Sequence, residues 1–289
     1  MSKIGTRSST RDILNQHDLR AKKRYGQNFL VDHNMLRKIV SFAAPDADTL
    51  VVEIGPGIGG LTEVLLEQAG HVLAYEIDDE LIPILEKQFR DKPFTLIHDD
   101  ILKRNVDADI DVLPKTFSRV LVIANLPYYI TTPILTKLLE ESKRVREYHV
   151  MMQYEVARRF TSPPATKDYN SLSVFIQFKT EATFLFKVPK QVFEPAPNVD
   201  SAVVKLLVKD QIKPFPTDEE WFYKVVRGSF VQRRKTLPNN LQASLGIDKA
   251  TTIVALESLG LNPSVRAEHL SVADFVRIAD RLLEQKDQI

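Results

Sequence analysis

The chain has 289 residues, of which 44% are hydrophobic and 27% charged, so it is long and apolar enough to bury a core. Its 39 Lys and Arg residues nearly balance 38 Asp and Glu residues, which excludes a uniformly basic protein. The absence of cysteine excludes disulfides, thiolate metal sites and cysteine nucleophiles. The first residues are polar and no run of about 18 apolar residues occurs, so we expect a soluble, cytoplasmic protein without a membrane partner.

Charge is distributed unevenly along the chain. Residues 1–40 hold nine basic and three acidic side chains, whereas residues 46–111 hold five basic and sixteen acidic ones. The window 221–240 is basic and contains no acidic residue. Such clusters suit phosphate groups, although the solvated face of a helix is an equally good interpretation of charge alone. The cations of interest are Lys22, Lys23 and Arg24 near the start, and Arg233, Arg234 and Lys235 in the later window.

Apolar runs alternate with amphipathic stretches over the first 209 residues. Buried strands are predicted over residues 50–54, 71–75, 94–98, 119–124 and 148–152. Helices are predicted over residues 35–42, 61–68, 80–89 and 132–140. Further strands over residues 174–178, 184–188 and 202–208 are expected to complete the sheet. The alternation of strand and helix indicates a doubly wound α/β domain.

The pattern changes near residue 209. Residues 211–216 include two prolines and show no periodicity, whereas the chain beyond them has helical spacing. Thr217 with Glu220, and Ser271 with Asp274, form capping-box patterns ahead of two predicted helices. We therefore expect residues 1–209 to form the α/β domain with a basic N-terminal arm, and residues 210–289 to form a small all-helical domain.

A glycine-rich turn follows the first predicted strand. Gly55, Gly57 and Gly60 have the spacing with which nicotinamide-dependent enzymes and methyltransferases both bind a nucleotide cofactor, so the glycines do not separate these classes. Glu76, at the end of the second strand, is placed to accept hydrogen bonds from ribose hydroxyls. Asp100, at the end of the third strand, could accept a hydrogen bond from an adenine amino group or cap the turn that follows.

The turn after the fourth strand, residues 125–128, favours one chemistry. The exocyclic amine of adenine is a poor nucleophile because its lone pair is delocalised into the ring. The side-chain oxygen of Asn125 and the carbonyl of Leu126 could accept its two hydrogens and free that lone pair. Pro127 would fix the backbone, and Tyr128 would offer a flat face for stacking. A nicotinamide oxidoreductase has no use for these four residues.

With these motifs the sequence resembles the ribosomal RNA adenine dimethyltransferases, and among them the bacterial small-subunit enzymes. The resemblance runs over nearly the whole chain and includes segments outside the predicted pocket. The matching segments are residues 26–30, 53–60, 75–78, 100–103, 125–128, 153–157, 193–204, 233–237 and 239–241.

This resemblance implies a Rossmann-like S-adenosylmethionine-dependent methyltransferase domain followed by a helical RNA-recognition domain. The implied reaction is dimethylation of the N6 amines of two adjacent adenosines in the 3′-terminal hairpin of small-subunit (16S) rRNA. It requires S-adenosylmethionine, yields S-adenosylhomocysteine and needs no metal. The implied partner is the small ribosomal subunit, and the implied state is a monomer.

The resemblance also assigns individual residues. Those expected to bind the cofactor are Asn28, Leu30, Gly55, Glu76, Asp100 and Asn125. Those expected to form the target pocket are Asn125, Leu126, Pro127 and Tyr128, with Phe193 flanking the flipped base from the opposite side. The two basic clusters would hold RNA phosphates. The six histidines are too scattered for a metal site.

Two further alternatives stay open. A large-subunit rRNA methyltransferase of the antibiotic-resistance type would share every cofactor and target residue, although residues 233–241 fit the small-subunit enzymes better. A non-enzymatic assembly or transcription factor on the same fold would use only the basic surfaces. The presence of Gly55, Glu76, Asp100 and Asn125 together argues against that second alternative.

Overall fold

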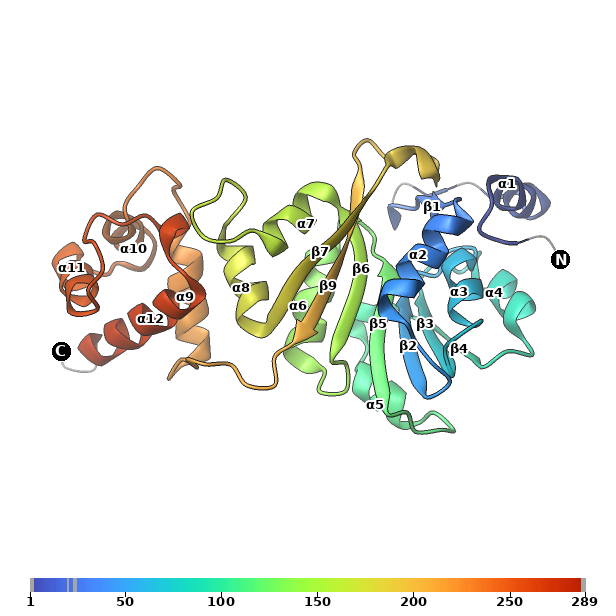
Figure 1. Ribbon diagram of the computed structural model, residues 1–289, viewed down its shortest axis with the longest axis horizontal. Helices are drawn as coiled ribbons and strands as arrows, with labels where there is room; N and C mark the ends of the chain where they lie inside the picture. Colours follow the sequence, from blue (N-terminus) through green and yellow to red (C-terminus); the bar gives the residue numbers. More distant parts are fainter. Residues whose placement is uncertain (1–2, 20, 23–24, 287–289) are drawn as a thin grey trace. The chain divides into compact units, whose positions relative to one another are not determined.

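The computed structural model describes residues 3–19, 21–22 and 25–286, and it divides into two compact units (Figure 1). The first unit comprises Met1–Ala157 and Thr183–Val208, and the second comprises Arg158–Ala182 and Lys209–Ile289. The limit after residue 208 lies one residue before the predicted boundary after residue 209. Residues 158–182, which the prediction assigned to the first domain, instead cluster with the second unit.

The first unit is organised around a seven-stranded sheet of order β4-β3-β2-β5-β6-β9-β7. Its strands are β2 (Thr49–Ile54), β3 (His71–Glu76), β4 (Phe94–His98), β5 (Arg119–Asn125), β6 (Glu147–Gln153), β7 (Thr180–Val188) and β9 (Ser201–Val208). The strands from β4 to β6 are parallel, and β9 pairs with β6 in the antiparallel direction. The strand order reverses between β2 and β5, which is where open α/β sheets bind ligands.

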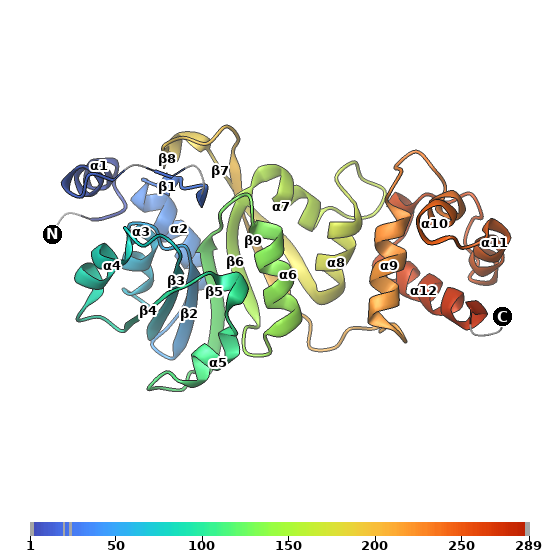
Figure 2. The same ribbon diagram turned by 180° about the vertical axis from the view of Figure 1, so that it is seen from behind.

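Helices cover both faces of this sheet, so its central strands are almost entirely apolar. Leu50, Val51 and Val52 of β2 are fully buried, as expected for a strand covered on both sides. The helices of this part of the chain are α1 (Arg7–Gln16), α2 (His33–Ala43), α3 (Gly60–Leu65), α4 (Ile82–Phe89), α5 (Val106–Asp111), α6 (Thr131–Glu141) and α7 (Tyr154–Thr161). Apolar side chains of α2 and α3 pack on one face, and Figure 2 shows α6 on the opposite face.

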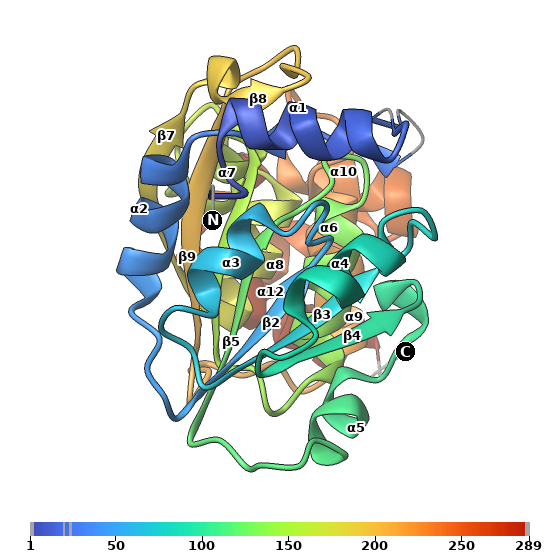
Figure 3. The same ribbon diagram turned by 90° about the vertical axis from the view of Figure 1, so that its right-hand side faces the viewer.

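A short ribbon joins the N-terminal segment to the loop after β7. Strand β1 (Phe29–Leu30) pairs antiparallel with β8 (Phe193–Glu194), so that Leu30 lies opposite Phe193. Helix α1 lies beside this ribbon (Figure 3), and its Arg7 forms a 3.0 Å ion pair with Glu194. These contacts hold residues 25–30 at the carboxyl ends of the strands.

The second unit is helical and packs around an apolar cluster. Its helices are α8 (Ser171–Lys179), α9 (Glu219–Ser229), α10 (Leu237–Leu245), α11 (Lys249–Ser258) and α12 (Val272–Lys286). The cluster includes Phe178, Phe222, Leu241, Leu256 and Phe275, each fully buried. In the described part of the chain, no helix combines the length and the apolar character needed to cross a membrane.

The strand predicted over residues 174–178 is wrong, because this segment is the middle of α8. Asn170 caps the helix by accepting hydrogen bonds from the backbone N–H groups of Leu172 and Ser173. Val174 and Phe178, four residues apart, then face the same helical core. A short apolar run fits a buried strand or a buried helix equally well, and here the polar cap decides.

The two predicted capping boxes have different outcomes. The Ser271 pattern is confirmed, because Ser271 accepts from the backbone of Asp274 and the Asp274 carboxylate accepts from the backbone of Ser271. The Thr217 pattern is wrong by one residue. Asp218 caps α9 instead, by accepting a 2.9 Å hydrogen bond from the Trp221 backbone.

Candidate active site

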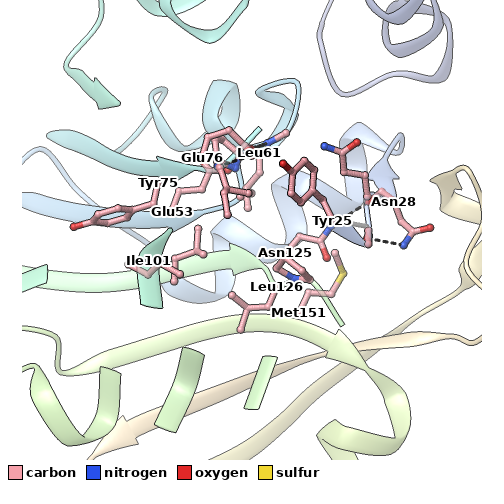
Figure 4. Close-up of a pocket in the computed structure, with 18 of the residues that line it drawn as sticks. Tyr25, Asn28, Glu53, Leu61, Tyr75, Glu76, Ile101, Asn125, Leu126 and Met151 are labelled. Atoms are coloured by element: carbon pink, nitrogen blue, oxygen red, sulfur yellow. Dashed lines mark hydrogen bonds between the residues drawn. The ribbon is translucent and has the colours of Figure 1, made fainter. Parts of the chain in front are cut away.

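A cavity of about 210 Å3 opens at the carboxyl ends of β2, β3 and β5 (Figure 4). The N-terminal residues 25–30, the glycine turn, residues 99–102 and the turn after β5 contribute to its lining. Every residue predicted to bind the cofactor lines it, namely Asn28, Leu30, Gly55, Glu76, Asp100 and Asn125. Leu126, Pro127 and Tyr128 of the predicted target pocket line it too. The sheet thus brings into one place residues that lie almost 100 positions apart in the sequence.

The glycine turn keeps backbone surface open toward this cavity. Gly55 has a φ of +67°, which favours glycine, and a Cβ built there would meet no atom within 4 Å. The space beside Gly55 is therefore part of the cavity, which a side chain would partly fill. This open backbone fits the close approach of an S-adenosylmethionine molecule.

Glu76 lies at the end of β3 with 5% of its surface exposed. Its Oε2 accepts a 3.2 Å hydrogen bond from the Gly57 N–H, and its Oε1 accepts from the N–H groups of Ile77 and Asp78 at 2.9 Å. Burial raises the pKa of Glu76, and these backbone donors oppose that shift. Three of about four acceptor positions on the carboxylate are occupied, which leaves capacity for a ribose hydroxyl.

Asp100 uses one of its oxygens in the structure of its own turn. Oδ1 accepts a 3.0 Å hydrogen bond from the Leu102 backbone and caps a short helix over Ile101–Lys103. Oδ2 makes no hydrogen bond to any described residue. The two interpretations of the sequence are therefore compatible, because one oxygen caps the turn and the other is available to an adenine amino group.

The side-chain amide of Asn125 is oriented by the N-terminal segment. Its Nδ2 donates a 3.2 Å hydrogen bond to the carbonyl of Asn28, which is drawn as a dashed line in Figure 4. Its Oδ1 accepts no hydrogen bond from the described part of the chain. The Leu126 N–H donates to the Met151 carbonyl at 3.1 Å, while the Leu126 carbonyl likewise has no donor among the described residues. Two acceptors are thus available at the end of β5.

Tyr128 is anchored at its hydroxyl, which lies 2.5 Å from Oγ of the buried Ser201 on β9. Burial raises the pKa of Tyr128, so its hydroxyl is neutral at physiological pH. Because the hydroxyl is anchored, the side chain is held beside the turn after β5 and cannot swing away from it.

The prediction for Phe193 needs correction. This side chain is 1% exposed, does not line the cavity, and packs in an apolar cluster with Leu30, Leu36 and Val188. Side chains alternate along β8, so that Glu194 faces solvent and Arg7 while Phe193 faces inward. In this conformation Phe193 therefore supports the β1-β8 ribbon and does not flank the target pocket.

The first basic cluster also differs from its prediction. The ammonium of Lys22 lies 2.6 Å from Asp78 and 2.9 Å from Glu80, so it is engaged within the protein. Burial alone would lower the pKa of Lys22, but these two carboxylates raise it. Lys23 and Arg24 lie outside the described residues.

The second basic cluster remains largely exposed on the helical unit. Arg233 lies 3.2 Å from Glu268, which neutralises part of its charge. Arg234 and Lys235 are exposed and form no ion pair with a described residue. This cluster therefore keeps two cations for an anionic partner.

Glu53 is a cavity residue to which sequence reasoning assigned no role. It is 1% exposed, lines the cavity, and accepts a 2.6 Å hydrogen bond from the hydroxyl of Thr62. Burial raises its pKa to about 8. The signal in the sequence is an acidic residue inside an otherwise apolar strand, which is costly unless the site has a use for it.

Replacing Glu53 with Gln is expected to change how stability depends on pH. Its pKa is about 8 in the folded chain and near 4.5 in the unfolded chain. The folded state therefore binds the proton more tightly, and wild-type stability falls as pH rises from about 5 to 8. Glu53→Gln removes this effect, so its advantage over wild type grows to at most about 4 kcal/mol by pH 8. Urea unfolding at several pH values measures the difference, and a gap that stays constant with pH would contradict the assignment.

Among the described residues, no three His, Cys, Asp or Glu side chains lie together in an arrangement that could hold a metal ion.

The sheet is doubly wound, and the glycine turn, the buried Glu76 and the Asn-Leu-Pro-Tyr turn lie together at the ends of its strands. This combination is that of a Rossmann-like S-adenosylmethionine-dependent methyltransferase. The chain belongs to the ribosomal RNA adenine dimethylase family, whose pattern matches residues 18–284. It is therefore an rRNA adenine dimethyltransferase.

Individual relatives agree with this family. Two relatives carry the name "Ribosomal RNA small subunit methyltransferase A". The protein from Lactococcus lactis subsp. lactis (strain IL1403) is 48% identical to this chain, over 96% of this chain and 95% of that protein. The protein from Streptococcus sanguinis (strain SK36) is also 48% identical, over 97% of this chain and 98% of that protein. A dimethyladenosine transferase from Plasmodium falciparum superposes with a TM-score of 0.73 at 26% identity, over 90% of this chain and 98% of that one. The 23S rRNA methyltransferase ErmE shares the fold, with a TM-score of 0.67 at 24% identity, over 88% of this chain and 99% of that one.

Proposed function

We propose that this protein dimethylates the N6 amines of two adjacent adenosines in the 3′-terminal hairpin of small-subunit (16S) rRNA. The observation that carries the proposal is the pair of available acceptors, Asn125 Oδ1 and the Leu126 carbonyl, at the edge of the cavity. The names of the relatives with 48% identity support the small subunit as substrate. The methylation would take place in the cytoplasm, on ribosomal particles, and the enzyme would act as a monomer.

The residues of the cavity divide between the two substrates. Gly55, Glu76 and Asp100 would hold S-adenosylmethionine through its methionine end, ribose and adenine, and Asn28 and Leu30 would contact it from the N-terminal segment. When bound, this cosubstrate supplies an electrophilic methyl group and departs as S-adenosylhomocysteine.

The target adenine would be held by the turn after β5. Asn125 Oδ1 and the Leu126 carbonyl accept the two N6 hydrogens, so the nitrogen lone pair points away from the ring system and becomes nucleophilic. Tyr128 presents its face to the base, and Pro127 keeps the two acceptors converged. The N6 proton passes to water after methylation. Positioning then supplies most of the rate, for which roughly 7–11 kcal/mol is available.

The target base must leave its helix to enter such a cavity, because N6 is inaccessible inside a stacked duplex. The helical unit would bind the surrounding RNA by shape and phosphate contacts, with Arg234 and Lys235 as its principal cations and Arg233 as a weaker one.

The decisive experiment compares small and large ribosomal subunits from cells that lack both modifications. The protein is incubated with radiolabelled S-adenosylmethionine and either particle, and labelled nucleosides are identified after RNA digestion. We expect N6,N6-dimethyladenosine from small subunits only. Label from large subunits would select the resistance-type activity, and label from neither would favour an assembly factor.

A further inference from the structure

A second hollow, of about 330 Å3, lies where β6 ends and β9 begins. Its lining residues are Gln153, Tyr154, Glu155, Lys190, Asn198, Val199 and Asp200. Most of these come from two segments, 153–157 and 193–204, that belong to the family pattern but have no role in the cavity described above. We call this feature the flanking hollow.

The flanking hollow adjoins the place where the target base is expected. Gln153, the last residue of β6, is the register partner of Ser201, the first residue of β9. Ser201 holds the hydroxyl of Tyr128, whose ring is the proposed stacking face for the target adenine. One strand pair therefore separates the flanking hollow from the target pocket, so consecutive nucleotides of one RNA strand could occupy both.

The walls of the hollow are held by Asp200. Its Oδ1 accepts a 3.0 Å hydrogen bond from the Lys190 backbone, its Oδ2 lies 2.7 Å from the Lys187 ammonium, and its carbonyl accepts from the Tyr154 backbone at 3.0 Å. The hydrogen bond with Lys187 lowers the pKa of Asp200, which keeps the carboxylate ionised. These contacts fix the segments that line the hollow relative to one another.

The chemistry offered inside is that of a base-reading site. The side-chain amides of Gln153 and Asn198 make no hydrogen bond to the part of the chain that is described, and each provides donors and an acceptor. Val199 is 44% exposed and adds an apolar surface. Asn and Gln amides pair in a bidentate manner with adenine, and unstacked RNA bases are recognised at such edges.

We propose that the flanking hollow binds the adenosine next to the one being methylated, with Gln153 and Asn198 reading its base. This inference rests on the proposed function, because it requires a substrate with two adjacent adenosines. It explains how an enzyme with one catalytic pocket selects a pair: the neighbour is recognised while the target is methylated.

The test uses unmodified small subunits reconstituted with rRNA in which one adenosine of the pair is replaced by uridine. The kcat/KM for methyl transfer to the remaining adenosine is compared with that for the natural pair. For wild type we expect the replacement to lower kcat/KM on the order of tenfold. The variant Gln153→Ala/Asn198→Ala should lose this preference and methylate both substrates at the same, lowered kcat/KM. The affinity for S-adenosylmethionine, measured by calorimetry, should not change.

The matched control is Gln68→Ala/Asn34→Ala, which removes two exposed amides, one on α2 and one just after α3. It should keep the wild-type preference. The inference is overturned if wild type methylates both substrates equally, or if the Gln153/Asn198 variant keeps the preference. A wild-type protein that methylates neither small nor large subunits overturns the proposed function itself, and this inference with it.

Discussion

Replacing Asn125 with alanine is expected to lower the rate constant of methyl transfer at least about a hundredfold, the loss typical when one aligned catalytic dipole is removed. The substitution deletes Oδ1, one of two acceptors available at the end of β5, and also the Nδ2 donor to Asn28. The adenine amine would then keep its lone pair in the ring. Single-turnover transfer to unmodified small subunits measures this rate.

The fold should survive the change, because Asn125 is only half-buried at the last position of β5. Thermal unfolding and circular dichroism test this point. Asn34→Ala, which removes an exposed amide from α2, serves as the control and should behave as wild type. Wild-type turnover by Asn125→Ala would refute the role of Oδ1 as an acceptor for the target amine.

The second large effect concerns the basic cluster of the helical unit. Changing Arg233, Arg234 and Lys235 together to alanine is expected to weaken RNA association and to flatten its salt dependence. Each cation that no longer neutralises a phosphate lowers the slope of log affinity against log salt by about 0.7–0.9. Arg233 is already paired with Glu268, so we expect the slope to fall by about twice this amount. Binding to unmodified small subunits is titrated at several salt concentrations.

A matched control keeps the net charge change the same. Lys87, Arg90 and Lys92 are exposed cations on and after α4 that form no ion pair with a described residue. Their triple alanine variant should bind RNA with the wild-type salt slope. An equal drop in slope for both triple variants would mean that overall charge, and not this cluster, drives binding.

Much of the cavity could be predicted from local sequence. Gly55, Glu76, Asp100 and Asn125 each follow an apolar run with the length of a buried strand, and parallel strands present their carboxyl ends at one edge. If the four runs form one parallel sheet, the four residues must therefore lie near one another at the same edge.

Contacts between residues far apart in the sequence could not be predicted in this way. Lys22 pairs with Asp78, which is 56 residues away, and the Asn125 amide is oriented by a carbonyl 97 residues away. Nothing in the neighbourhood of either residue encodes these partners. The inward direction of Phe193 likewise depends on the two-residue pairing of β1 with β8.

The class of fold and most of the cavity lining could be predicted from the sequence, because strand and helix periodicity and turn composition are local properties of the chain. Two features depend on the tertiary structure: which cations stay exposed, and the hollow that Gln153 and Asn198 line together. These features arise from the packing of distant segments, in which each side chain's burial and partners depend on elements that its own neighbours do not specify.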